Sequence, residues 1–195
     1  MNKKLIIGGI VAVVVAIVAY KVLSLRAQAA KWAGPMKEIT EENVTHDNNV
    51  TTTRFVSLIG APVDQVQRAI WDVENSQNMV ENIKLSKLLE AKDNTKLMEI
   101  NLQALNLPLQ SFTMMWTLYA DQHRITFKTV KSQAQDIDGE YQLEPSPDGT
   151  KTRLVYTSTS RDKIAVPFPQ SVLESANRET YVNTVRGIEK QIKQG

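Results

Sequence analysis

The chain ends in the stretch PQSVLESANRETYVNTVRGIEKQIK, residues 169–193, which decides how the rest of the sequence is interpreted. Apolar and small side chains recur in it at a helical spacing, at Val172, Ala176, Thr180, Thr184, Ile188 and Ile192, with Leu173, Tyr181 and Val185 beside them. This pattern predicts one long amphipathic helix. An antiparallel sheet with an apolar face needs a cover, and a helix laid across a curved sheet can leave a cavity between the two layers.

The part of the chain before this helix is a run of strands. Apolar and polar residues alternate there between clusters of turn residues, which is typical of half-buried strands. The alternation predicts seven strands, at 52–59, 83–90, 96–103, 112–120, 124–132, 136–144 and 150–161. Pro62 begins a short helix after the first strand, with Val66, Ala69, Ile70 and Val73 on one face.

Alternate side chains of these strands share one face, which we expect to be concave and to face the terminal helix. The predicted ligand pocket is lined by Met98, Ile100, Leu102, Phe112, Met114, Trp116, Phe127, Tyr141, Leu154, Tyr156, Ala176, Thr180, Tyr181 and Thr184. Small residues in the middle of the helix leave room where a packed core usually carries Leu or Ile. The same residues also suit an ordinary filled core, and residue types alone do not separate the two interpretations.

A family resemblance begins at the first strand. The passage FVSLIGAPVDQV, residues 55–66, followed by Ile70-Trp71-Asp72, resembles the opening of the SRPBCC superfamily, which includes START lipid-transfer domains, pollen-allergen-like proteins and polyketide cyclase or ubiquinone-binding proteins. The resemblance extends over about residues 50–193. It implies an α+β helix-grip fold, in which a seven-stranded antiparallel sheet wraps a long C-terminal helix and encloses a hydrophobic pocket. Residues 77–83 depart from the bacterial relatives, so no catalytic residue is carried over.

The first 25 residues predict a transmembrane anchor. Leu5 to Tyr20 are uncharged, and the 21 residues from Leu5 to Leu25 are interrupted only by Lys21. At about 1.5 Å per residue the longer run spans about 31 Å, close to the roughly 30 Å of a bilayer core. A cleaved signal peptide is the alternative, with 27–29 as its cleavage site.

These segments predict the domain organisation. We expect a transmembrane anchor at 1–25, a tether at 26–50 and the folded domain at 51–195. The predicted location is a bacterial inner membrane, crossed once. Basic residues flank the apolar run on both sides, so they give only a slight preference for a domain outside the cytoplasm.

Charge and chemistry exclude several functions. Six basic residues precede the first acidic one, Glu38, and subtracting them from 23 leaves 17 against 21 acidic residues, a net charge of −4. We therefore expect no nucleic-acid partner. The two histidines, His46 and His123, and the absence of cysteine predict no metal site or triad, and no cofactor motif is present. Alternating acidic residues at 136–144 fit a solvated outer face better than paired catalytic carboxylates.

Three functions fit these features. The first is membrane-tethered binding or transfer of a hydrophobic small molecule, of the lipid or quinone class, without enzymatic activity. The second is a cyclase or dehydratase acting on an apolar substrate in the same pocket, which requires a positioned acid or base. The third is a structural or assembly module with a filled cavity. An apolar loop at Leu105, Leu107, Pro108 and Leu109 is a candidate lid or bilayer contact, and the sequence names no protein partner.

Overall fold

The structure is a computed structural model that describes residues 20, 30–105, 107–164 and 168–194. The chain divides into two compact units, Met1–Pro35 and Met36–Gly195. In the first unit the described residues are 20 and 30–35. The second unit contains the whole sheet and the helix that covers it.

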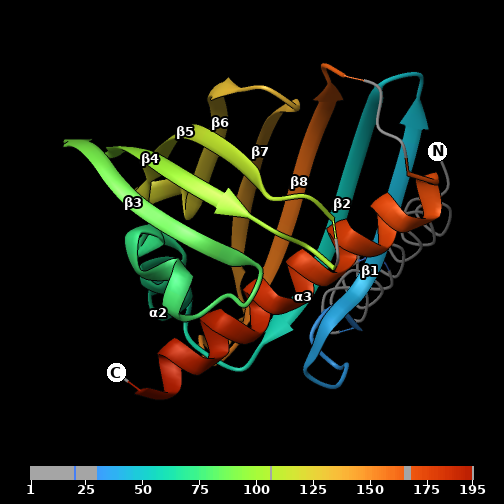
Figure 1. Ribbon diagram of the computed structural model, residues 1–195. Coiled ribbons are helices and arrows are strands. Elements are labelled where there is room, and N and C mark those ends of the chain that lie inside the picture. Colours follow the sequence, from blue (N-terminus) through green and yellow to red (C-terminus); the bar gives the residue numbers. More distant parts are fainter. Residues whose placement is uncertain (1–19, 21–29, 106, 165–167, 195) are drawn as a thin grey trace, which may run out of the picture. The chain divides into compact units, whose positions relative to one another are not determined.

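The second unit is an antiparallel sheet with helices on one side (Figure 1). The strand order is β1-β2-β8-β7-β6-β5-β4-β3. The strands are β1 (Lys37–Asp47), β2 (Val50–Ile59), β3 (Ile83–Lys92), β4 (Thr95–Leu102), β5 (Gln110–Tyr119), β6 (Arg124–Ser132), β7 (Gln135–Pro145) and β8 (Thr152–Asp162). The helices are α2 (Val63–Trp71), the 3-10 helices η1 (Val73–Asn78) and η2 (Ala120–Gln122), and α3 (Gln170–Gln194). Figure 1 shows α3 running diagonally across the curved sheet.

The helix-grip fold is therefore confirmed, whereas the predicted number of seven strands is wrong. Residues 37–47, expected to belong to a tether, form an eighth strand, β1, at the edge of the sheet. Its side chains do not alternate between apolar and polar. The strand pairs with β2 through the backbone, and Glu41 adds ion pairs to Arg54 of β2 and Arg153 of β8, each at 2.9 Å. Apolar contacts of β1 with the core come from only two residues, Ile39 and Val44.

The predicted location in an inner membrane is contradicted. Across the described ranges, no helix combines the length and the apolar character that crossing a bilayer requires. The predicted anchor itself, residues 1–25, lies outside the described residues except for Tyr20.

Helix α3 is attached to the sheet and to η1 through specific contacts. The Tyr181 hydroxyl lies 2.6 Å from Ser57 Oγ of β2. Gly187 passes so close to the 79–80 segment that a Cβ atom on it would lie 2.9 Å from the carbonyl oxygen of Met79. The buried residues of α3 are Ala176, Tyr181, Val185, Gly187 and Ile188. These contacts attach α3 to β2 and to the segment that follows η1.

Candidate functional site

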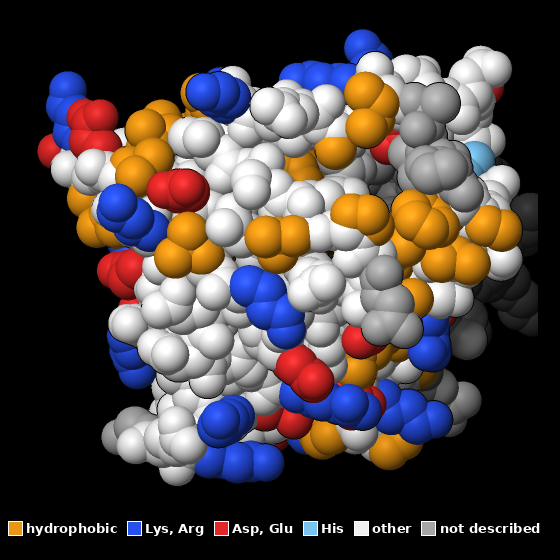
Figure 2. All heavy atoms as spheres, in the orientation of Figure 1, with side chains coloured by type: hydrophobic (Ala, Val, Ile, Leu, Met, Phe, Trp, Pro, Cys, Tyr) orange, Lys and Arg blue, Asp and Glu red, His pale blue; other side chains and the backbone are white. Residues whose placement is uncertain are grey.

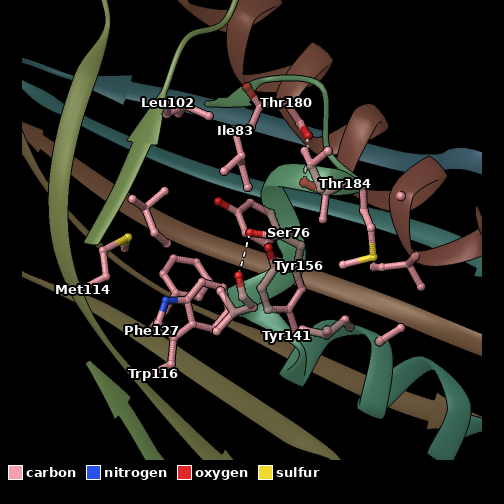
Figure 3. A pocket seen from close by; sticks show the side chains of 18 of the residues that line it. Ser76, Ile83, Leu102, Met114, Trp116, Phe127, Tyr141, Tyr156, Thr180 and Thr184 are labelled. Carbon is pink, nitrogen blue, oxygen red and sulfur yellow. Dashed lines mark hydrogen bonds between the residues drawn. The ribbon is translucent and has the colours of Figure 1, made fainter. Parts of the chain in front are cut away.

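An internal cavity of about 160 Å³ lies between the sheet, α3 and the α2–η1 segment (Figure 3). In Figure 3, Trp116, Phe127, Tyr141 and Tyr156 of the sheet face Thr180 and Thr184 of α3. Ten of the predicted pocket residues line this cavity: Ile100, Leu102, Phe112, Met114, Trp116, Phe127, Tyr141, Tyr156, Thr180 and Thr184. The expected position of the cavity, opposite the middle of the terminal helix, agrees with this geometry.

Four predicted pocket residues lie elsewhere. Met98 and Leu154 point to the same face but are fully buried in the core, each 0% exposed. Ala176 lines a smaller neighbouring cavity, and Tyr181 bonds Ser57 on the β2 side.

Further lining residues were not predicted from the sequence. They are Ala69, Ile70, Val73, Ser76, Met79, Val80, Ile83, Ile137, Gly187, Ile188 and Gln191. The apolar face of the short helix was visible in the sequence, but nothing showed that it reaches the cavity. Gly187 and Gln191 follow Thr180 and Thr184 at helical spacing. This spacing could have been used to predict that they line the same cavity.

The sheet side of the cavity is a connected group of aromatic rings. Trp116 lies 5.2 Å from Phe127 and 6.2 Å from Tyr141, measured between ring centroids. Tyr156 continues the group, 5.2 Å from Tyr141. Desolvation by burial raises the pKa of Tyr141 well above its ordinary value and also raises the pKa of Tyr156. Both phenols are therefore neutral at physiological pH.

The hydroxyl groups on the helical side bond the backbone. Thr180 Oγ1 donates to the carbonyl oxygen of Ala176 at 2.8 Å, and Thr184 Oγ1 donates to that of Thr180 at 2.9 Å. Ser76 Oγ donates to the carbonyl oxygen of Val73 at 2.7 Å. The described lining residues include no carboxylate, imidazole or amine. The cavity thus suits an apolar guest and has no residue that would act as a general base at neutral pH.

Two further spaces lie between the cavity and the loop after β4. The first, about 80 Å³, shares Leu102 and Thr180 with the main cavity. The second, about 370 Å³, shares Leu107 and Pro108 with the first space and reaches the exposed Leu109. Figure 2 shows hydrophobic side chains gathered in this region of the surface, between the end of β4 and the start of α3. The apolar loop noted in the sequence therefore lies at the outer end of a row of spaces.

The two histidines lie away from the cavity. His46 is in β1, where its Nδ1 lies 2.9 Å from Thr51 Oγ1. His123 follows η2 with a φ of 47°, and its Nδ1 lies 3.2 Å from Gln67 Oε1. Within the described ranges, no three His, Asp or Glu side chains are grouped so that they would hold a metal ion.

An antiparallel sheet wrapped on a C-terminal helix with an apolar cavity between them defines a helix-grip protein. The sequence profile of the family described as "Polyketide cyclase / dehydrase and lipid transport" matches residues 59–181, and the chain belongs to this family. The superfamily resemblance seen at residues 55–72 is thereby confirmed.

Solved structures with the same fold are distant in sequence. The Zhui aromatase/cyclase from Streptomyces sp. R1128 has 14% identity and a TM-score of 0.66, covering 74% of this chain and 94% of its own. A START superfamily protein from Mycobacterium smegmatis has 11% identity and a TM-score of 0.60, covering 73% and 97%. The structure titled Ara h 8.0201 has 12% identity and a TM-score of 0.58, covering 75% and 99%. No curated protein sequence matches significantly. At these identities the similarities show the fold alone.

Proposed function

We propose that this protein binds a small hydrophobic molecule in the cavity between the sheet and α3. The observation that carries this proposal is a cavity of about 160 Å³, lined by aromatic rings of the sheet and by threonine and glycine residues of α3. Burial of apolar surface provides the affinity of such sites, and a few polar atoms orient the guest. The family match, which covers lipid transport as well as cyclases, supports a hydrophobic ligand.

The volume of the cavity indicates the size of the guest. An apolar cavity of about 150 Å³ is known to accept benzene, whereas pockets for drug-sized ligands measure roughly 300–1,000 Å³. The cavity therefore suits one ring. Leu102 and Thr180 line both the main cavity and the 80 Å³ space beside it, so a longer guest that extends in this direction passes these two side chains.

Binding is tested with toluene as the probe and with a variant that fills the cavity. Thr184→Leu adds apolar volume to the lining, while Ser175→Leu makes the same kind of change on the exposed face of α3. We expect toluene to raise the melting temperature of the wild type and of Ser175→Leu, but not that of Thr184→Leu. Mass spectrometry of protein purified under native conditions then identifies the natural guest. The proposal would be refuted if toluene left the melting temperature of the wild type unchanged and the purified protein carried no bound compound.

A cyclase or dehydratase is the second candidate, because the family match includes both activities. The groups at the cavity that could take part in acid–base chemistry are the hydroxyls of Tyr141 and Tyr156. Burial raises the pKa of both, so each would serve as a hydrogen-bond donor or general acid rather than as a base at neutral pH. Tyr141→Phe and Tyr156→Phe test this candidate: an enzyme loses turnover, and a binding protein retains its guest.

A further inference from the structure

The indole nitrogen of Trp116 is a buried donor without a protein partner. The residue is 8% exposed, and its Nε1 atom forms no hydrogen bond with any described residue. Buried tryptophan N–H groups usually find an acceptor, because leaving one unpaired is costly. The ring packs against Phe127 and Tyr141 and lines the cavity. The cavity lies beside this ring, and an acceptor on a guest would reach the nitrogen after a small shift of the neighbouring side chains.

Gln191 carries a complementary unpaired atom and lines both this cavity and a separate hollow beside Asp72. Its Nε2 donates to Asp72 Oδ2 at 2.7 Å, and because a carboxylate oxygen only accepts, this bond fixes which end of the amide carries the nitrogen. The other end, Oε1, is a buried acceptor that has no hydrogen-bond partner. Gln191 lines the cavity together with Trp116.

We propose that Trp116 and Gln191 are the two polar recognition points of the cavity, and that its ligands are ring-sized apolar molecules that carry oxygen. Trp116 donates to a carbonyl or hydroxyl oxygen of the ligand, and Gln191 accepts a hydrogen bond from a ligand hydroxyl. This inference rests on the proposed binding function and adds to it a chemical class, the oxygen-substituted ring. A saturated hydrocarbon guest leaves both atoms unpaired.

The test compares three probes of similar size. Toluene has no hydrogen-bonding oxygen, benzaldehyde has an acceptor, and phenol has both an acceptor and a donor. Because the probes differ in hydration, the measured quantity is the ratio of the Kd for toluene to the Kd for each oxygenated probe. We expect Trp116→Phe to lower this ratio for phenol and benzaldehyde by roughly fivefold. Gln191→Leu lowers it for phenol alone. Trp71→Phe, outside this cavity, is the matched control and leaves all ratios unchanged.

A direct readout does not depend on the stability of the variants. In the wild type labelled with ¹⁵N at tryptophan, the Trp116 indole N–H resonance lies further downfield with phenol and benzaldehyde than with toluene, whose ring current affects the signal without a hydrogen bond. Trp32→Phe and Trp71→Phe assign the three indole signals by elimination. This experiment is informative even where Trp116→Phe does not fold.

The outcomes separate this inference from the proposed function. If none of the three probes binds, the binding function itself fails and this inference fails with it. A different result is that toluene binds, while the variants leave the Kd ratios unchanged and the indole resonance is the same with oxygenated probes as with toluene. In that case only the recognition by Trp116 and Gln191 is overturned. The latter result is expected if buried water satisfies both atoms in the presence of any guest.

Discussion

The ring of Phe127 lies directly against Gly139, its partner across the β6–β7 ladder. A Cβ atom on Gly139 would lie 2.9 Å from Cε2 of Phe127 and would also contact the ring tip and the carbonyl oxygen of Thr157. The absence of that atom allows the ring to lie flat on the β7 backbone. Phe127 can then take its place in the cavity wall, 5.9 Å from Tyr156 between ring centroids.

Gly139→Ala is expected to push Phe127 towards the cavity. Overpacking of this kind typically costs about 1–3 kcal/mol, so the free energy of unfolding falls and toluene binding weakens with it. Urea denaturation and toluene titration measure the two effects. Gly60→Ala is the matched control, because a Cβ there would meet its nearest neighbour, Met36 Sδ, at an ordinary 3.7 Å. Equal behaviour of the two variants would show that Phe127 relaxes without cost.

The contact between Tyr181 and Ser57 is expected to stabilise the attachment of α3. Ser57 Oγ lies 2.6 Å from the Tyr181 hydroxyl and donates to the carbonyl oxygen of Glu38 in the β1 strand. Tyr181→Phe removes one hydrogen bond and should cost about 1 kcal/mol, while Ser57→Ala leaves both partners unsatisfied and should cost about 2 kcal/mol. Chemical denaturation of both variants and of the double variant measures the coupling, and additive losses would mean that the contact contributes nothing.

The tyrosines of the cavity predict a loss of stability at high pH. Burial raises the pKa of Tyr141 and Tyr156 in the folded protein, while the same phenols ionise near pH 10 when the chain unfolds. Below pH 10 both states are protonated and stability is unaffected. Above pH 10 only the unfolded state loses protons, so stability falls by at most about 1.4 kcal/mol per pH unit for each tyrosine.

Urea denaturation between pH 8 and pH 11.5 measures this dependence. Tyr141→Phe and Tyr156→Phe should each make the fall shallower, because the phenylalanine cannot ionise in either state. Tyr119→Phe, on a residue that is 36% exposed, serves as the control and should follow the wild type. A wild-type curve that stays flat to pH 11.5 would mean that the buried phenols ionise in the folded state.

The sequence predicted the parts of this structure that depend on periodicity. The row of Phe112, Met114 and Trp116 has the period of a strand, and α3 has the period of a helix. The apolar face of the sheet and the helix that covers it could therefore both be predicted. Strand β1 was missed because its side chains do not alternate; it pairs with the neighbouring β2, and the ion pair that connects it to β8 joins Glu41 to Arg153, 112 positions further along the chain. Local patterns do not show such pairs.

The polar atoms of the cavity could not be predicted for a similar reason. Gln191 lies on the helix face that also carries Thr184, yet its orientation depends on Asp72, which precedes it by 119 positions. Trp116 was expected at the cavity, but whether its nitrogen finds a partner is a property of the complete packing. The residues that could give the cavity its chemical selectivity are thus those for which long-range contacts matter most.

Leu102 lines both the main cavity and the 80 Å³ space beside it, and Leu102→Ala is expected to join them. Deleting a partly buried leucine costs about 2 kcal/mol, since both the transfer of the side chain and the enlarged space contribute. The joined space should favour a two-ring guest, so the affinity for naphthalene should rise relative to that for toluene. Calorimetric titration measures both affinities, and Leu89→Ala, on a β3 residue that is 45% exposed, is the control. An unchanged ratio of the two affinities would show that the surrounding residues collapse into the vacated volume, and that Leu102 does not limit the length of the guest.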